Sequence, residues 1–492
     1  MSEGLAPLLQ IVLVPIILAP ITYYSSKKMG IKSGYIAFIA LLYSSILMSW
    51  VALSYATASR PIIEEYNWAP VAGLYFGLRA DGLSIPVALI ILLLSTATAI
   101  YSMSYMEHKS GTGMYFALYL LYAAGMTGTV LATNLIQFYL FWELMLVPSY
   151  FLIAEWGYGD RERVSFKYFI YTHIGALSLL AGILATYAFT GTFSIYELSN
   201  KASMIPPEVL RWILVAMCIG FFVKMAVVPL HTWLPDAHAE APTPISVLLS
   251  GVMIECGVYA MTRIVISPFY RFFTSFSTAL TMLAVVTMFY GGMMALVQSD
   301  IKRLLAYSSI SQMGYMLFGM SVATYYGIMG AIYHILSHAC AKGLLFACAG
   351  AIMHQTEGKR DIRTLGGLAQ RMPVTAILFT VGVFSLAGVP TLAGFISEFM
   401  IFLGGFEGAE TTGKVAIVII AVLCAALTTA YGLWALRRVF FGPLKPELSE
   451  VKEASLLMLI PMSFLAVLSF LFGIYPKIPL TFLDPWARSA IP

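Results

Sequence analysis

The sequence predicts an all-α polytopic membrane protein of about 14 transmembrane helices, with two inverted five-helix repeats and broken helices 7 and 12. Of its 492 residues, 60% are hydrophobic and only 11% are charged, whereas soluble domains carry about 25% charged residues. Apolar runs long enough to cross a hydrocarbon layer of about 30 Å follow one another along the chain. Proline-rich breaks interrupt two of these runs.

Each apolar run is expected to be a helix, because backbone groups must satisfy one another in lipid. The expected helices cover residues 5–24, 34–55, 83–104, 113–132, 134–154, 166–190, 211–230, 244–266, 274–297, 304–322, 325–353, 373–402, 414–438 and 453–474. Most Lys and Arg fall in the loops of one side, and few fall on the other: Arg60, Arg79, Lys201, Arg211, Arg271 and Lys414. This bias places the basic side in the cytoplasm and both termini outside a prokaryotic cell membrane.

The two breaks set the expected organisation of the chain. Four prolines interrupt the segment from Lys224 to Pro244, and Pro390 interrupts the segment from Ser385 to Gly394. Interrupted spans in corresponding positions of two halves are typical of inverted-repeat transporters. We therefore expect helices 1–3 in residues 1–112, the first repeat (helices 4–8) in 113–267, the second (helices 9–13) in 268–440, and helix 14 in 441–492.

No resident cofactor or metal is expected. The five cysteines are scattered without a CxxC pair, which argues against iron–sulfur and zinc sites. Walker and dinucleotide-binding motifs are absent from the sequence. A net charge of +4, spread over loops, does not indicate nucleic-acid binding.

Lys224 is the most informative residue, because it lies inside the apolar run 212–228. A charge near the bilayer centre costs roughly 2.5–3.5 kcal/mol on insertion scales, so such residues usually have a function. Further ionisable residues lie within other apolar segments: Glu143, Glu255, His334, His338, Lys342 and Glu398. A row of buried acids and bases predicts a path for protons or other cations.

Glu143 needs a partner or a proton at its apolar position, and Lys224 is the expected partner. The alternative is a purely structural ion pair that locks two helices together. We favour a functional pair, because a permanently paired buried couple is often no more stabilising than apolar side chains.

His334, His338 and Lys342 follow one another at intervals of four residues, on one face of a helix. Three titratable groups on one stripe favour a proton relay over histidines that merely hydrogen-bond in the core, and a zinc site lacks further ligands. Glu398 is the expected last group before an exit.

The roles of the other ionisable residues are less specific in the sequence. Glu255 is expected between Lys224 and the stripe, with pairing to Arg263 as the alternative. We expect His173 to be a polar packing residue. His231 and His238 are expected in a tight polar loop, either admitting protons from the cytoplasm or capping the backbone.

Three segments resemble the antiporter-like subunits of respiratory complex I: Phe141–Ile153, Lys224–Pro244 and Asp300–Gln312. The resemblance extends over nearly the whole chain. The family that it resembles also includes subunits of membrane-bound hydrogenases, F420H2 dehydrogenases and Mrp-type sodium/proton antiporters. It implies a 14-helix fold, a Glu143–Lys224 coupling pair, and a second half-channel formed by the helix 11 and helix 12 residues.

Glu398, where other subunits carry Lys, looks most like the M-type (chain 4) subunit. After helix 14, the residues up to 492 are not expected to form the long lateral helix of the L-type subunit. M-type subunits usually carry a central Lys in helix 8, and the corresponding residue here is Glu255.

The sequence therefore predicts a proton- or sodium/proton-translocating subunit of a complex-I-like pump. Electrons would move in partner subunits, including iron–sulfur proteins, while further antiporter-like subunits would lie beside it. The alternatives are an Mrp-type antiporter subunit without redox partners and a non-conducting scaffold, which would not need the buried titratable residues.

Overall fold

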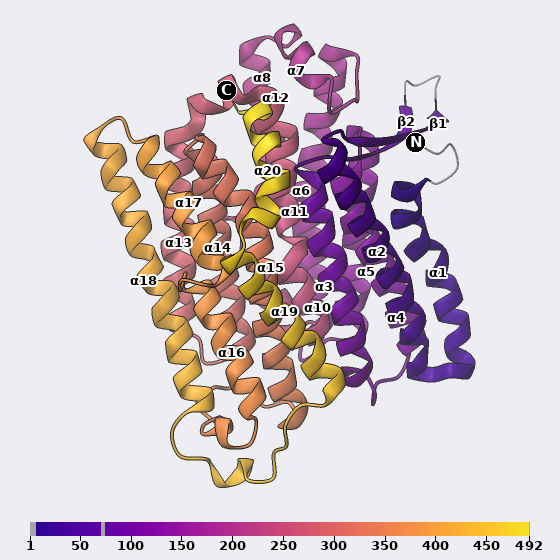
Figure 1. Cartoon of the computed structure of the whole chain (residues 1–492), viewed down its shortest axis with the longest axis vertical. Coiled ribbons are helices and arrows are strands. Elements are labelled where there is room, and N and C mark those ends of the chain that lie inside the picture. Colours follow the sequence, from indigo (N-terminus) through magenta and orange to yellow (C-terminus); the bar gives the residue numbers. More distant parts are fainter. Residues whose placement is uncertain (1–5, 70–73, 492) are drawn as a thin grey trace.

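The computed structural model describes residues 6–69 and 74–491. Among these residues, nine helical stretches are long and apolar enough to cross a membrane. The long helices run side by side, from α1 at one edge of the molecule to α18 at the other (Figure 1).

The first half of the chain is helical except for a β-hairpin. Its elements are α1 (Pro7–Met29), η1 (Gly30–Ser33), α2 (Gly34–Ala58), β1 (Ile62–Ala69), β2 (Leu74–Ala80), α3 (Ser84–Tyr105), α4 (Thr112–Leu131), α5 (Leu135–Trp156), α6 (Arg161–Thr190), α7 (Leu198–Lys201), η3 (Ala202–Met204), α8 (Pro207–Met225), α9 (Leu234–Glu240), α10 (Thr243–Leu248), η4 (Leu249–Met253), α11 (Glu255–Ala260) and η5 (Met261–Ile266).

The second half is described as helices and loops. Its elements are α12 (Ser267–Phe273), η6 (Thr274–Phe276), α13 (Ser277–Leu296), α14 (Ile301–Ser321), α15 (Tyr325–Gln355), η7 (Leu368–Gln370), α16 (Pro373–Leu386), α17 (Ala393–Glu407), α18 (Thr412–Phe440), η8 (Pro446–Leu448), α19 (Leu456–Ile474) and α20 (Lys477–Ala490).

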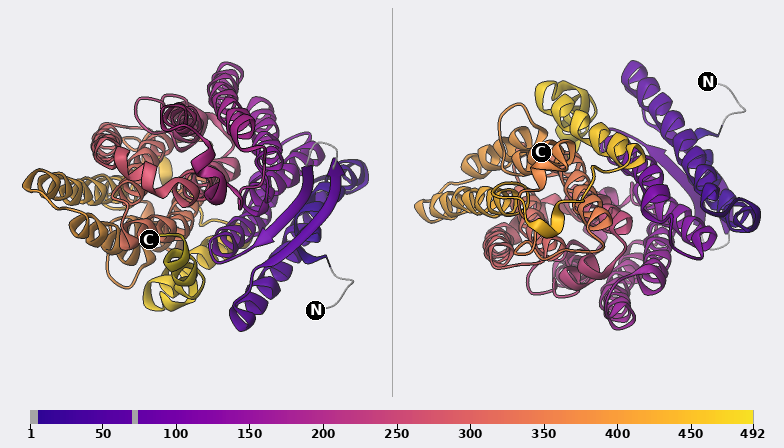
Figure 2. Two further views of the ribbon diagram at one scale, coloured as in Figure 1. Left: turned by 90° about the horizontal axis from the view of Figure 1, so that it is seen from above. Right: turned by 90° about the horizontal axis from the view of Figure 1, so that it is seen from below.

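The β-hairpin and α20 were not expected from the sequence. In β1, inward and outward residues alternate over only a few positions, so the pattern is short beside the apolar runs around it. The strands pair antiparallel, with Tyr66 opposite Phe76. β2 contacts α1, α3 and α4. The hairpin lies across the end of the molecule at which α1 begins (Figure 2).

Both expected breaks are present. Helix α8 ends at Met225, and Ala226 takes a left-handed φ of 54°. Pro235 and Pro244 then lie in the first turns of α9 and α10, where a missing N–H costs no hydrogen bond. The second break separates α16 from α17, and Gly388 in this break has a φ of +66°.

The segment expected as one regular helix, residues 244–266, instead alternates between α-helical and π-helical turns. The wide turns η4 and η5 flank the short helix α11, which begins at Glu255. Such turns are rare and are frequent at functional sites.

Helix α15 is the centre of the molecule. Every residue in its most apolar 18-residue window is buried. It packs against α3, α10, α14, α16, α17 and α19. Thr324 caps its first turn by accepting a hydrogen bond from the Gly327 N–H at 3.2 Å. Side chains on α15 are therefore held between both halves of the chain.

Candidate functional site

The ionisable residues expected at membrane depth are mostly buried inside the protein. Lys224, Glu255, His334, His338 and Lys342 are each at most 1% exposed, and Glu398 is 6% exposed. Glu143 is the exception, with 20% of its side chain exposed. Most of these side chains therefore face the protein interior, and Glu143 on α5 reaches the surface of the subunit.

The expected direct ion pair between Glu143 and Lys224 is not formed. The Lys224 Nζ lies 4.8 Å from the centroid of the Trp142 ring, and no hydrogen-bond acceptor for it is found among the described residues. Trp142, itself 1% exposed, fills the space beside the ammonium. An aromatic face attracts a desolvated cation by about 2 kcal/mol, which partly replaces an anionic partner.

Glu143 faces His173 instead. Its Oε2 lies 3.4 Å from the His173 Nδ1, and the imidazole stacks on Phe169 with ring centroids 5.4 Å apart. His173 is therefore the partner of the partly exposed Glu143, a role that the sequence did not predict. Its adjacency to Glu143 arises from the packing of α5 against α6, which chain order does not reveal.

Glu255 and His338 meet at the centre of the molecule. The Glu255 Oε1 lies 2.5 Å from the His338 Nδ1. The second oxygen of Glu255 and the Nε2 of His338 have no partner among the described residues. This contact joins α11 to the stripe on α15, and it leaves one polar atom on each side of the pair for a further proton donor or acceptor.

The alternative pairing of Glu255 with Arg263 is wrong. The Arg263 Nη2 lies 2.5 Å from Asp81 Oδ1, and Arg79 contacts the other oxygen of Asp81 at 3.2 Å. Asp81 also accepts hydrogen bonds from the backbone of Leu83 and Ser84 at the start of α3. This cluster fixes η5 to the beginning of α3.

Lys342 is fully buried and donates hydrogen bonds to α14. Its Nζ bonds the Leu305 carbonyl oxygen at 2.9 Å and also the Ser308 hydroxyl. Both acceptors are neutral, and among the residues that the structure describes no carboxylate pairs with this lysine.

His334 is held by two side chains. Its Nδ1 lies 2.8 Å from the Ser397 Oγ, and its Nε2 lies 2.7 Å from the Gln312 Oε1. Ser397 directly precedes Glu398 on α17. The bond from His334 to Ser397 therefore connects α15 to the part of α17 that carries Glu398, the expected last group before the exit. One oxygen of Glu398 has no partner among the described residues. Ser397 and Gln312 were missed because neutral side chains carry no signal in an apolar sequence.

His231 lies in the turns between α8 and α9, as expected, whereas the expectation that His238 lies in a tight polar loop is wrong. His238 is fully buried on α9 and stacks on Phe346, with centroids 5.2 Å apart. His231 packs edge-on against Tyr290 at 4.8 Å. Neither nitrogen of His238 has a partner among the described residues, so this histidine does not cap the backbone.

Lys302 is a buried cation, although residue 302 falls in a loop between the helices expected at 274–297 and 304–322. Its Nζ donates to the Ala241 carbonyl oxygen at 2.5 Å and lies 5.5 Å from the Tyr158 ring centroid. Nearby, Arg360 pairs with Asp300 at 2.9 Å and with Glu240 at 3.1 Å. These bonds tie the start of α14 to the break after α9.

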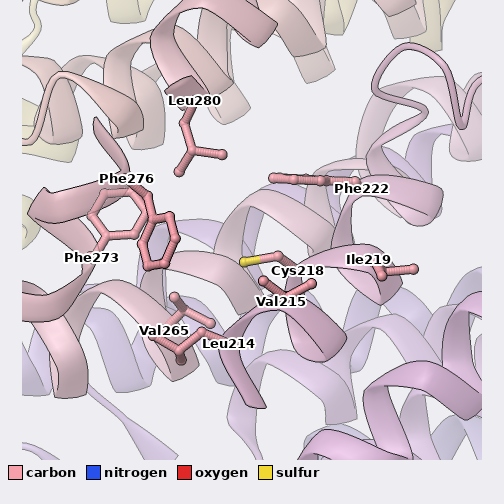
Figure 3. Close-up of a pocket in the computed structure, with 9 residues that line it drawn as sticks. All are labelled: Leu214, Val215, Cys218, Ile219, Phe222, Val265, Phe273, Phe276 and Leu280. Atoms are coloured by element: carbon pink, nitrogen blue, oxygen red, sulfur yellow. The ribbon is translucent and has the colours of Figure 1, made fainter. Parts of the chain in front are cut away.

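Two negative findings delimit the site. Within residues 6–69 and 74–491, no three His, Cys, Asp or Glu side chains are grouped as metal ligands. A separate pocket of about 130 Å³ between α8, η5 and α13 is apolar, and Cys218 supplies its one side-chain heteroatom (Figure 3). The pocket lining contains no histidine and no charged side chain.

Comparison with known proteins identifies the family. Residues 132–427 match the family described as NADH:quinone oxidoreductase/Mrp antiporter, TM, and residues 68–116 match the N-terminus of complex I chain 5. The chain is 32% identical to F(420)H(2) dehydrogenase subunit M of Methanosarcina mazei, over 95% of this chain and 94% of that protein. It is 34% identical to NAD(P)H-quinone oxidoreductase chain 4 1 of Synechococcus elongatus, over 97% and 90%.

Solved structures with the same fold support this assignment. A chain of respiratory complex I from Thermus thermophilus aligns with a TM-score of 0.88 and 26% identity, over 99% of each chain. A chain of an archaeal membrane-bound sulfane sulfur reductase aligns with a TM-score of 0.86 and 30% identity, over 96% of this chain and 76% of that chain. The resemblance inferred from the motifs is confirmed: this chain belongs to the NADH:quinone oxidoreductase/Mrp antiporter family of membrane-spanning subunits.

Proposed function

We propose that this chain is an ion-translocating subunit of a redox-driven, complex-I-like pump, and that protons or sodium and protons pass along its buried row. The observation that carries the proposal is the buried Glu255–His338 contact at 2.5 Å, since it joins titratable groups from two helices at the centre of the protein. A scaffold has no need of such a contact, because burying charged groups is costly.

The proposed path begins at Glu143 and Lys224. Lys224 without a carboxylate partner corresponds to a loosened state of the pair, in which the ammonium gives up its proton most readily. The proton passes to Glu255, then to His338 and Lys342, and His334 with Ser397 leads on towards Glu398. His231 and His238 belong to uptake from the cytoplasm. Movement of Glu143 towards Lys224 closes the pair and retains the proton, because opposite charges within about 4–6 Å stabilise each other.

We also propose the organisation that this function requires. Fourteen spans form helices 1–3 (residues 1–112), inverted repeats in 113–267 and 268–440, and helix 14 in 441–492. The α8–α9 break and the α16–α17 break occupy equivalent places in the two repeats. The chain lies in a prokaryotic cell membrane with both termini outside.

The partners proposed are other membrane subunits, and indirectly hydrophilic iron–sulfur subunits. The exposed side chains of Glu143 (20%) and His173 (37%) support a neighbouring subunit on this face. Both groups would otherwise meet acyl chains at membrane depth, where charges are expensive. The chain itself holds no redox cofactor in this proposal.

The proposal is tested with Glu143→Gln and Lys224→Ala in the assembled complex. Proton uptake into inverted vesicles should fall to background per electron transferred, while subunit composition stays normal. Lys201→Ala is the matched control, since Lys201 pairs with Glu197 outside the row. Near-normal uptake by either row variant would refute the proposal.

A second candidate is an Mrp-type antiporter subunit without redox partners. The chain is 34% identical to a Na(+)/H(+) antiporter protein of Alkalihalophilus pseudofirmus, over 97% of this chain and 62% of that protein. Purification of the native complex separates the two candidates: iron–sulfur subunits favour the pump, and membrane subunits alone favour the antiporter.

A further inference from the structure

A basic pocket lies at the end of α18, and none of its lining residues belongs to the row of ionisable groups. It has a volume of about 480 Å³ and is lined by Arg363, Arg437, Arg438 and Lys445, together with apolar residues that include Trp434 and Phe441. The loop that follows α18 lies at the same end of the molecule as the turn between α1 and α2 (Figure 1). This is the side to which the distribution of Lys and Arg assigns the cytoplasm.

The cations of this pocket are not fully neutralised by the protein. Arg363 pairs with Asp361 at 2.8 Å, and Lys445 donates to the Arg363 carbonyl oxygen. Within the part of the chain that the structure describes, Arg437 and Arg438 have no carboxylate oxygen within the 4.0 Å that defines an ion pair. The pocket therefore presents an excess of positive charge to an incoming group.

The apolar part of the pocket continues onto a surface suited to acyl chains. Leu423 and Leu433 on α18 are 65% and 43% exposed, so this chain leaves apolar side chains of the helix uncovered and open to acyl chains. Trp434 marks the depth of the interface, and the Arg438 guanidinium lies 5.9 Å from its ring centroid. A ligand that is anionic at one end and apolar at the other matches a basic pocket that adjoins an apolar helix surface.

We propose that the pocket binds the phosphate headgroup of an anionic phospholipid, whose acyl chains lie along α18. Basic pockets at the cytoplasmic ends of transmembrane helices are suited to such headgroups. The helix C-terminus carries partial negative charge on its carbonyl groups, which holds Arg437 and Arg438 near the pocket. A free phosphate would use the cations but not Trp434 or the lipid-facing leucines.

The test uses the purified complex after mild delipidation in detergent. Native mass spectrometry measures retention of added dioleoylphosphatidylglycerol and dioleoylphosphatidylcholine by the wild type, by R437Q/R438Q and by K27Q/K28Q. The last variant is the matched control, because Lys27 and Lys28 also form a basic pair in the last turn of a helix. The expected result is loss of one tightly held phosphatidylglycerol from R437Q/R438Q alone.

The affinity of that lipid should fall about 25-fold in the double variant, since each basic residue near an anionic headgroup contributes about five-fold. Equal retention by R437Q/R438Q and the wild type would overturn the proposal, and so would equal binding of phosphatidylcholine. If the double variant does not assemble, two measurements still decide. Lys445→Gln should weaken phosphatidylglycerol about five-fold, and excess inorganic phosphate should fail to displace the lipid from the wild type. Displacement by phosphate would indicate a free-anion site instead.

Discussion

Replacing Glu255 by Gln separates the structural role of this residue from its role in transport. The side chains of glutamate and glutamine have nearly the same shape, and the amide of glutamine can still form a hydrogen bond with the imidazole of His338. Loss of a charge-assisted bond for a neutral one costs about 1 kcal/mol. Removal of all hydrogen-bonding capacity in Glu255→Leu costs about 1–3 kcal/mol, because the His338 Nδ1 is then buried without its partner. The Gln variant should therefore assemble normally.

Transport should respond differently from stability. An amide does not take up and release a proton at physiological pH, so Glu255→Gln interrupts the path between Lys224 and His338. Loss of a positioned acid–base group typically slows a proton-transfer step by about 100-fold or more. Uptake into inverted vesicles, measured by quenching of a pH-sensitive dye and normalised to electron transfer, should fall to background.

The control and the double variant sharpen this experiment. Glu453→Gln removes a carboxylate that bonds the start of α16 at 2.8 Å, outside the row, and should leave uptake normal. The double variant Glu255→Gln/His338→Gln should be no worse than the single one, because steps in series fail together. Normal uptake by Glu255→Gln would refute the assignment of this residue to the path.

Two further predictions concern the structure around the row. Arg263→Gln removes the partner that lies 2.5 Å from buried Asp81 but leaves Arg79 at 3.2 Å, so the assembled complex should lose about 1–3 kcal/mol of stability, seen as unfolding at a lower temperature in a thermal melt; an unchanged melt would contradict this. Gly388→Ala places a Cβ 2.5 Å from Glu398 Oε2 at a φ of +66°, and should impair pumping. Gly191→Ala, at a φ of +65° with nothing within 4 Å, carries the backbone strain without the clash and should pump normally.

Much of the fold was predictable because lipid restricts the choices. Apolar length predicted a mostly helical membrane protein, and prolines predicted the breaks after Met225 and Leu386. The β-hairpin was missed because its alternation covers few residues. The π-helical turns beside Glu255 were also missed, since no residue type specifies a wide turn and packing decides it.

The burial of the candidate site residues was predictable, but their pairings were not. A charged residue in an apolar run is visible in the sequence, and most of the residues named in this way are buried. Which groups meet depends on helix packing, and this explains why Glu143 faces His173 while Trp142 lies beside Lys224. Lys302 was missed because it lies at the first turn of α14, where a basic residue usually reaches water.

The central claim is that the buried groups exchange protons along one hydrated row. A map of the assembled complex that resolves ordered solvent tests it most directly. The account predicts water molecules that connect the Lys224 Nζ to Glu255, and Lys342 to His238 and Glu398. Continuous dry packing of aliphatic side chains between these groups would contradict it.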